Sequence, residues 1–271
     1  MRLLILLVFA LLVIESPAQK KKEKKPKIDG FLPVTINGKT LYVAETETTT
    51  TQWVEFIKYQ AEAEALAAED SVLVINPFNS CVRQMFFDKR AFYRDTTYKD
   101  SKGRKILSQV QCSRLPITGI TFEQAQAYCD YLNSSRNIEF YPYPTFRLAT
   151  PEEMAAIQQQ SALPAKEMAA GVNDKGCMLL NYRHNSWCES NIGIKAEYGY
   201  AVPLPVRFFF PSNDGLWDVF GNVAEMTSEK GVAMGGSCKD VIADCQPGAR
   251  NNYDGPAYWL GFRVVAELRN P

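Results

Sequence analysis

The sequence contains a single histidine, His184, among its 271 residues. Zinc and iron sites built from several histidines of one chain are therefore excluded. The sequence also lacks a GxSxG motif, so nothing in it indicates the serine nucleophile of an α/β-hydrolase. We expect His184, in the segment NYRHNSW, to be an ordinary loop residue.

Long apolar segments are also lacking. The apolar run from Leu3 to Ile14 is twelve residues long, and a membrane-spanning helix needs about 20. This run follows Met1-Arg2 and precedes Ser16-Pro17-Ala18, whose small residues suit a signal peptidase. We therefore predict a signal peptide over residues 1–18, cleaved near Ala18, and a protein exported to the periplasm or cell surface without a transmembrane segment.

The chain has no net charge, because 30 basic residues balance 30 acidic ones. The balance is uneven, since six lysines and one glutamate lie between Lys20 and Lys27. We expect residues 19–30 to form a basic disordered leader, either solvated or touching an anionic surface through Lys20 to Lys27. No basic stripe alternates with aromatic residues, so nucleic acid is not an expected partner.

The seven cysteines are an odd number and cannot all pair within the chain. In the oxidising exported compartment, Cys238 and Cys245 are candidates for a disulfide that fastens one loop. Cys129 is expected to stay free, because it lies on the apolar stripe of a predicted helix. The other candidate pairs are Cys177 with Cys188 and Cys81 with Cys112.

Two helix starts are predicted by capping boxes, in which a hydroxyl and a side-chain oxygen satisfy backbone amides reciprocally. The first box pairs Thr121 with Gln124, and the second pairs Thr150 with Glu153. Pro151 stands at the first helical position, where its missing N–H is harmless. The apolar stripe of the first helix is Phe122, Ala125, Cys129 and Leu132.

A further helix is expected to begin near Thr49 to Thr51 and to bury Trp53, Phe56 and Ile57. Beyond Pro164 the sequence becomes irregular, and the runs 232–234 and 262–265 are typical of short strands. The predicted architecture is an α+β domain over residues 31–271 with few helices, short strands and much irregular loop.

Glycine-anchored segments follow one another between residues 215 and 267: GLWDVFGNVAEMTSEK, VAMGGSCKD, GARNNY and LGFRVVAE. Upstream stand ETETTTTQWVEF, LPITGITFEQAQAYCDYLN and FRLATPEEM. In this order the segments resemble the formylglycine-generating enzyme, or sulfatase-modifying factor, domain family over about residues 31–267. The resemblance implies a variant of the C-type lectin-like fold. VAE in place of VWE, and CKDV after GGS, are most similar to the gliding-motility and type IX secretion proteins GldK and GldJ.

By this resemblance, the calcium positions of the family are Asp218, Gly221, Val223 and Glu225. The chemistry agrees, because Ca²⁺ prefers oxygen ligands and the loop offers two carboxylates together with backbone carbonyls at a glycine turn. We expect a structural Ca²⁺ ion rather than a catalytic one. The alternative is that Asp218 and Glu225 cap turns or pair with basic groups.

The family's enzymes hold Cu(I) between two cysteines five positions apart, shortly after the GGS turn, and soft Cu(I) favours such ligands. Here Cys238 follows Ser237 directly and Cys245 stands seven positions later, so neither spacing matches and copper is not expected. If the protein were an enzyme, Cys238 and Cys245 would be its candidate catalytic residues.

In relatives, the region that corresponds to Arg250, Asn251, Asn252 and Arg263 lines or supports the ligand cleft. The alternative is that the two arginines are internal struts that donate hydrogen bonds to loop carbonyls.

The leading hypothesis is an exported, non-catalytic scaffold or binding protein of the cell envelope. Its partners would be envelope proteins or another polypeptide, in a gliding or type IX secretion assembly. A copper- or thiol-dependent oxidase that modifies a partner polypeptide is the enzymatic alternative. A lectin-like binder of glycan or peptide is suggested by fold analogy alone.

Overall fold

The computed structural model describes residues 27–67, 98–99, 105–107, 114–136, 143–183 and 203–269. The predicted signal peptide, most of the basic leader, His184 and three cysteines (Cys81, Cys112 and Cys188) lie outside these residues. No helix in the described ranges combines the length and apolar character that crossing a membrane requires. The elements, in chain order, are β1 (Phe31–Ile36), β2 (Lys39–Ala44), α1 (Thr50–Ala67), β3 (Tyr98–Lys99), β4 (Lys105–Leu107), α5 (Phe122–Arg136), β5 (Tyr143–Leu148), α6 (Pro151–Ser161), α7 (Ala165–Ala170), β6 (Ala224–Met226), β7 (Val232–Met234), η1 (Ile242–Cys245), β8 (Arg250–Asn252), β9 (Leu260–Gly261) and β10 (Val264–Arg269).

The larger sheet is antiparallel and has the strand order β1-β2-β10-β5. Its first two strands form a hairpin around Asn37 and Gly38, which both have positive φ, of 50° and 79°. An Asn-Gly pair suits this turn because both residues tolerate left-handed backbone. The sheet therefore joins the two ends of the described chain, with the last strand paired to the second.

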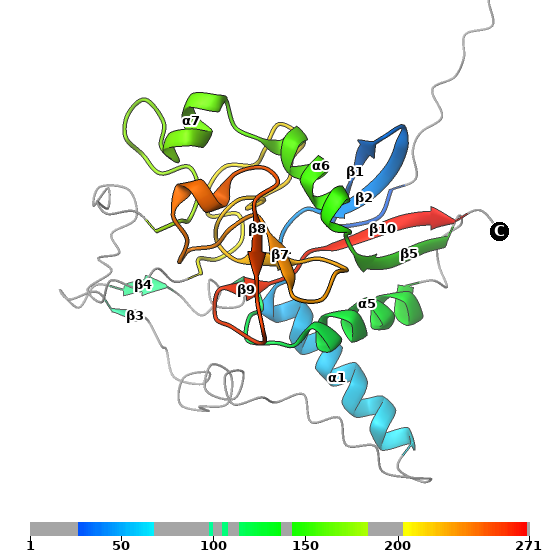
Figure 1. Ribbon diagram of the computed structural model, residues 1–271. Coiled ribbons are helices and arrows are strands. Elements are labelled where there is room, and N and C mark those ends of the chain that lie inside the picture. The colour runs from blue at the N-terminus through cyan, green and yellow to red at the C-terminus, as the bar shows by residue number, and fades with distance from the viewer. Residues whose placement is uncertain are drawn as a thin grey trace, which may run out of the picture.

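Both faces of this sheet are covered, so its side chains alternate between two apolar clusters. Tyr42 packs in the cluster that includes α1 and α5, whereas its neighbours Leu41 and Val43 pack in the cluster that includes α6. Figure 1 shows α5 and α6 on opposite sides of the sheet. In β10 the same alternation places Val264 and Val265 on opposite faces.

The predicted helix starts are confirmed. The amide of Gln124 donates to the Thr121 hydroxyl at 3.2 Å and the amide of Thr121 donates to Gln124 Oε1 at 2.9 Å. Thr150 and Glu153 form the second capping box, with Pro151 as the first residue of α6. The apolar stripe predicted for α5 is buried: Phe122, Ala125, Cys129 and Leu132. In α1, Trp53 and Phe56 are buried as predicted, whereas Ile57 is half-buried.

The second sheet is small and has the order β8-β7-β6-β9, in which β6 and β9 are parallel and the other pairs antiparallel. The strand predicted over 232–234 is β7. The strand predicted over 262–265 is wrong in its first half, because Phe262 and Arg263 lie between β9 and β10. The backbone leaves the strand here as the side chain of Arg263 turns into the interior, where several acceptors surround it.

The region beyond Pro164 is less irregular than predicted, because α7 begins directly after this proline. The helix is six residues long and ends at Gly171, which has a left-handed φ of 68°. With so few residues it carries no periodic apolar pattern, and only Met168 is buried. Gly171 serves as the helix terminator, since its N–H donates to the carbonyl of Glu167.

Candidate functional site

The segment from Asp218 to Glu225 leads into β6 and is fixed by backbone bonds to other loops. The amides of Gly221 and Asn222 donate to the carbonyls of Gly235 and Asn181, at 2.9 and 2.8 Å. Gly221 has a φ of 74°, and a Cβ at this position would lie 2.4 Å from the Asn181 carbonyl oxygen. Only glycine satisfies both the backbone conformation and the close approach.

Several residues in and near this segment have a left-handed backbone conformation. In the described part of the chain, four non-glycine residues have positive φ, and one of them is Asn37 in the hairpin turn. The other three are Arg207 (63°), Asp218 (53°) and Asn222 (58°). Arg207 and Asp218 are in contact, since the Arg207 amide donates to Asp218 Oδ2 at 2.8 Å. Such conformations each cost about 1–3 kcal/mol and persist where the surroundings impose them.

Glu225 and Arg263 form a buried ion pair at 1% and 0% exposure. Arg263 Nε donates to both carboxylate oxygens of Glu225, at 2.9 and 3.1 Å, and Nη2 donates to Oε1 at 2.6 Å. Its remaining donors reach the carbonyls of Ala44 at 2.9 Å and Trp217 at 2.7 Å. Arg263 is therefore an internal strut whose enclosed guanidinium does not line a cleft, and a supporting role for it stays a prediction.

A third acidic residue, Glu47, lies in the same interior and has 0% exposure. Its Oε2 accepts a hydrogen bond from Asn222 Nδ2 at 2.8 Å, and its Oε1 accepts one from the amide of Val223 at 3.1 Å. The side chain of Asn222 also binds both backbone groups of Leu204. The segment between β2 and α1 is thereby joined to the loop that enters β6.

The electrostatic balance of this interior is unfavourable for the carboxylates. Burial, followed by the nearby Asp218 and Glu225, raises the pKa of Glu47 well above its usual value, although Arg263 and Asn222 oppose the shift. Burial also raises the pKa of Asp218 and of Glu225, and the attraction of Arg263 offsets only part of either shift. Arg263 acts on all three carboxyl groups, and Arg114 also lowers the pKa of Asp218.

The two cysteines of the GGSCKD segment and of η1 are enclosed. Cys238 and Cys245 are both 0% exposed and both are free thiols. Burial, together with the nearby Asp240, raises the pKa of each thiol to about 12. Cys245 Sγ lies 4.0 Å from the carbonyl oxygen of Ser237. The disulfide predicted between them is not formed in the structure, whereas Cys129 is free and buried as expected.

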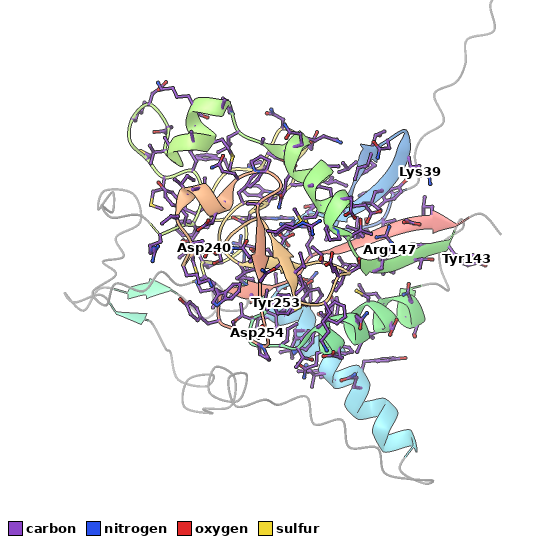
Figure 2. All side chains as sticks on the ribbon, viewed as in Figure 1. Lys39, Tyr143, Arg147, Asp240, Tyr253 and Asp254 are labelled. Carbon is purple, nitrogen blue, oxygen red and sulfur yellow. The ribbon has the colours of Figure 1, made fainter. Side chains whose placement is uncertain are left out.

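The other residues predicted for a ligand cleft lie on β8, at the edge of the second sheet. Arg250 is half exposed and stands 3.6 Å from Glu152 and 3.8 Å from Glu229, so surface carboxylates flank it. Asn252 is exposed, whereas Asn251 is half-buried and its Oδ1 has no hydrogen-bond partner. Tyr253, which follows the strand (Figure 2), likewise has a buried hydroxyl without a partner.

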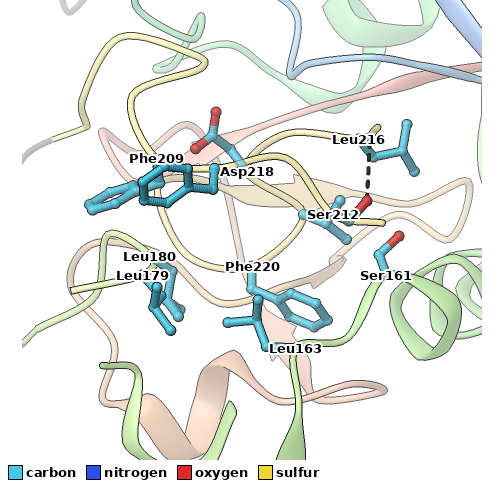
Figure 3. A pocket seen from close by; sticks show the side chains of 11 residues that line it. Ser161, Leu163, Leu179, Leu180, Phe209, Ser212, Leu216, Asp218 and Phe220 are labelled. Carbon is cyan, nitrogen blue, oxygen red and sulfur yellow. Dashed lines mark hydrogen bonds between the residues drawn. The ribbon is translucent and has the colours of Figure 1, made fainter. Parts of the chain in front are cut away.

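A pocket of about 30 Å³ adjoins the calcium candidate Asp218 (Figure 3). The apolar side chains that gather in it come from several segments, and the carboxylate of Asp218 points away from them. One polar atom inside, the hydroxyl of Ser161, is buried and has no partner. The volume suits a water-sized group. The apolar residues lining the pocket are Leu163, Leu179, Leu180, Phe209, Phe210, Leu216, Val219 and Phe220.

The structure therefore brings together three of the predicted site residues, Asp218, Glu225 and Arg263, and keeps Arg250 at the edge of the second sheet. The sequence reasoning missed Glu47 as a member of this cluster. Nothing in its local sequence indicates burial, because glutamate is almost never fully buried unless it is paired. The segment from Asp218 to Glu225 was identified in the sequence by its resemblance to a family motif.

Two covered sheets, short strands and the glycine-bound loop define an α+β domain with the formylglycine-generating-enzyme variant of the C-type lectin-like fold. The chain belongs to the family described as the sulfatase-modifying factor enzyme 1-like domain, which it matches over residues 18–268. No curated protein matches the chain.

Solved structures that are similar to this chain have low sequence identity to it. CarF is 17% identical with a TM-score of 0.50, over 83% of this chain and 85% of CarF. Variable protein 1 of Treponema denticola is 15% identical with a TM-score of 0.48, over 87% of this chain and 94% of that protein. PvdO of Pseudomonas aeruginosa is 16% identical with a TM-score of 0.44, over 86% of this chain and 83% of PvdO.

Proposed function

We propose that this protein is an exported, non-catalytic member of its family that serves as a scaffold or binding protein in the cell envelope. The observation that carries the proposal is the state of Cys238 and Cys245, two fully buried thiols. Burial and nearby carboxylates raise the pKa of both to about 12. A thiolate is the species that binds metal or attacks a substrate, and this environment opposes its formation.

The proposed location and assembly rest on the sequence. The N-terminal apolar run and its small-residue cleavage site support export. The segments VAE and CKDV support a role in a gliding-motility or type IX secretion assembly, by their similarity to GldK and GldJ. Because that fold also carries unrelated functions, the assembly is part of the proposal rather than a consequence of the fold.

We also propose that a structural Ca²⁺ ion binds the loop from Asp218 to Glu225. The carboxylates of Asp218 and Glu225 and the carbonyls of Gly221 and Val223 would hold it, and oxygen is the donor that Ca²⁺ prefers. The proposal is supported by the pKa values of Glu47, Asp218 and Glu225, which burial raises although Arg263 opposes the shift of each. A bound cation would supply the missing positive charge and tie the loop to β6.

Oxygen consumption with a sulfatase-type CxPxR peptide, in the presence of Cu(I), tests the non-catalytic assignment. We expect no turnover above the rate of a Cys238→Ser, Cys245→Ser double variant. Turnover by the wild type that the double variant loses would contradict the assignment and support an oxidase.

Co-purification from envelope fractions tests the scaffold role. We expect the protein to run in a defined complex whose partners mass spectrometry identifies after crosslinking. A protein recovered from these fractions only as an unattached monomer would contradict the assembly, and binding to a glycan array instead would support a lectin-like role.

A further inference from the structure

The carboxylate of Glu47 holds the segment that carries the proposed calcium ligands. Its two oxygens are bound to neighbouring residues of that segment: Oε1 to the amide of Val223 at 3.1 Å and Oε2 to Asn222 Nδ2 at 2.8 Å. Glu47 is 0% and Asn222 1% exposed, so solvent does not compete for these bonds. No ion pair with Arg263 engages Glu47, since that guanidinium binds Glu225 and two carbonyls.

The directions of the two candidate ligand carbonyls are set by the amides that follow them. The N–H groups of Asn222 and Ala224 donate to backbone carbonyls of other segments, at 2.8 and 2.9 Å. In a trans peptide group the C=O points away from the N–H. These bonds therefore fix the directions of the Gly221 and Val223 carbonyls.

Glu47 controls the peptide group between those two carbonyls. This group joins Asn222 to Val223; its N–H donates to Glu47, and its C=O accepts from the amide of Cys238 at 2.9 Å. A carboxylate bond that holds this group restrains ψ of Asn222 and φ of Val223, the two torsions that lie between the candidate ligand carbonyls. A side chain from the segment between β2 and α1 thus restrains a loop that lies far away in the sequence.

We propose that Glu47 is the positioning residue of the calcium site. It orients the peptide group between the carbonyls of Gly221 and Val223, and its negative charge adds to that of Asp218 and Glu225 beside the ion. The inference rests on the calcium site proposed above. Residues that orient metal ligands without touching the ion commonly change metal affinity by about 10–100-fold when replaced.

The test is a calcium titration by calorimetry of the wild type and of Glu47→Gln, together with thermal melts in calcium and in chelator. The glutamine keeps an oxygen for the Val223 amide but removes the charge and places an NH₂ group opposite Asn222. We expect about tenfold weaker calcium binding. We also expect a smaller calcium-induced rise of Tm than in the wild type, because the single oxygen of glutamine cannot accept both of the bonds that Glu47 accepts.

Two further variants frame this result. Asp218→Asn, which alters a proposed ligand, should also weaken calcium binding. Glu123→Gln is the matched control, because Glu123 is 59% exposed and pairs with Lys230, and it should leave calcium binding unchanged. Equal calcium affinity in Glu47→Gln and the wild type would overturn the role of Glu47 alone. If the wild type itself does not bind calcium, the calcium site is refuted first and the role of Glu47 with it.

Hydrogen exchange on the wild type keeps the inference testable should Glu47→Gln fail to fold. Calcium should slow exchange in the peptide that contains residues 219–226 and also in the peptide that contains residues 45–50, because Glu47 joins the two. Protection restricted to residues 219–226 would contradict the positioning role.

Discussion

Two of the arginine–glutamate clusters in the described part of the chain are built from the same groups in opposite environments. On the larger sheet, Arg147 (Figure 2) binds Glu153 at 2.6 and 2.7 Å and also pairs with Glu267, and its side chain is 29% exposed. In the interior, Arg263 binds Glu225 at 0% exposure. The first cluster joins a strand to a helix start at the surface, and the second joins the two sheets through the loop of the candidate site.

The comparison shows that burial decides the protonation energetics of a carboxylate even when its partner is the same. Burial raises the pKa of Glu153, but the hydrogen bonds from Arg147 and from the Thr150 amide outweigh it, and the net pKa is lowered. For Glu225 burial outweighs the attraction of Arg263, and the net pKa is raised. The surroundings of Glu153 therefore favour its charged form, whereas the surroundings of Glu225 disfavour its charged form.

The largest expected effect is that of Arg263→Met, which leaves Glu225 buried without a partner. Removing one member of a buried ion pair typically costs about 3–5 kcal/mol, so the free energy of unfolding measured in urea should fall by this amount. Arg147→Met is the matched control at the surface. Equal losses in the two variants would contradict the distinction between the clusters.

Gly221→Ala should be the next most damaging change. The new methyl group would lie 2.4 Å from the Asn181 carbonyl oxygen, on a backbone with φ of 74°. We expect a loss of about 2–4 kcal/mol in the free energy of unfolding, from left-handed strain and overpacking together. Gly248→Ala separates the two terms, because Gly248 has a similar φ of 79° and no atom within 4 Å. If both variants lose the same free energy of unfolding, the close approach at Gly221 does not contribute to the loss.

Arg147→Met should have a smaller effect, of about 0.5–1 kcal/mol, because the pair is partly exposed and solvent screens it. A double-mutant cycle with Glu153→Gln isolates the interaction from the loss of packing by the arginine stem. A coupling energy as large as the loss expected for Arg263→Met would show that the exposed fraction of an ion pair does not predict its contribution to stability in this protein.

The smallest expected effect is the pH dependence that Glu153 contributes. Its folded-state pKa is lowered, so its contribution is fully present above the unfolded-state pKa of about 4.3 and is lost as pH falls through the folded-state pKa. Between pH 7 and pH 3 the wild type should lose more stability than Glu153→Gln, measured as a difference in urea midpoints. A larger loss by the variant would reverse the sign and reject the assignment.

The two clusters also differ in how far the sequence predicts them. The capping box of Thr150 and Glu153 is local, so a start of α6 at Pro151 follows from four adjacent residues, and the structure confirms it. Glu153 pairs with Arg147 only six positions earlier. Short-range chemistry of this kind leaves a pattern in the sequence.

The interior cluster leaves no such pattern, because its members come from distant segments. Glu47 and Asn222 meet only after the first hairpin and the second sheet have packed together. A resemblance to a family places Asp218 and Glu225 on the loop and Arg263 in a region that lines or supports a cleft, but it does not show that this guanidinium is fully buried. Tertiary contacts decide such burial, and a residue's position in a motif does not.

The non-catalytic assignment depends most on the state of the two thiols that follow the GGS turn. A crystal grown with silver or cuprous ion, compared with a Cu(I) titration followed by thiolate charge-transfer absorption, tests it directly. We predict that the reduced protein holds no metal between Cys238 and Cys245 and that Cys238→Ser, Cys245→Ser binds as little Cu(I) as the wild type. A metal ion found between these two sulfurs, with stoichiometric Cu(I) binding that the double variant loses, would contradict the non-catalytic assignment.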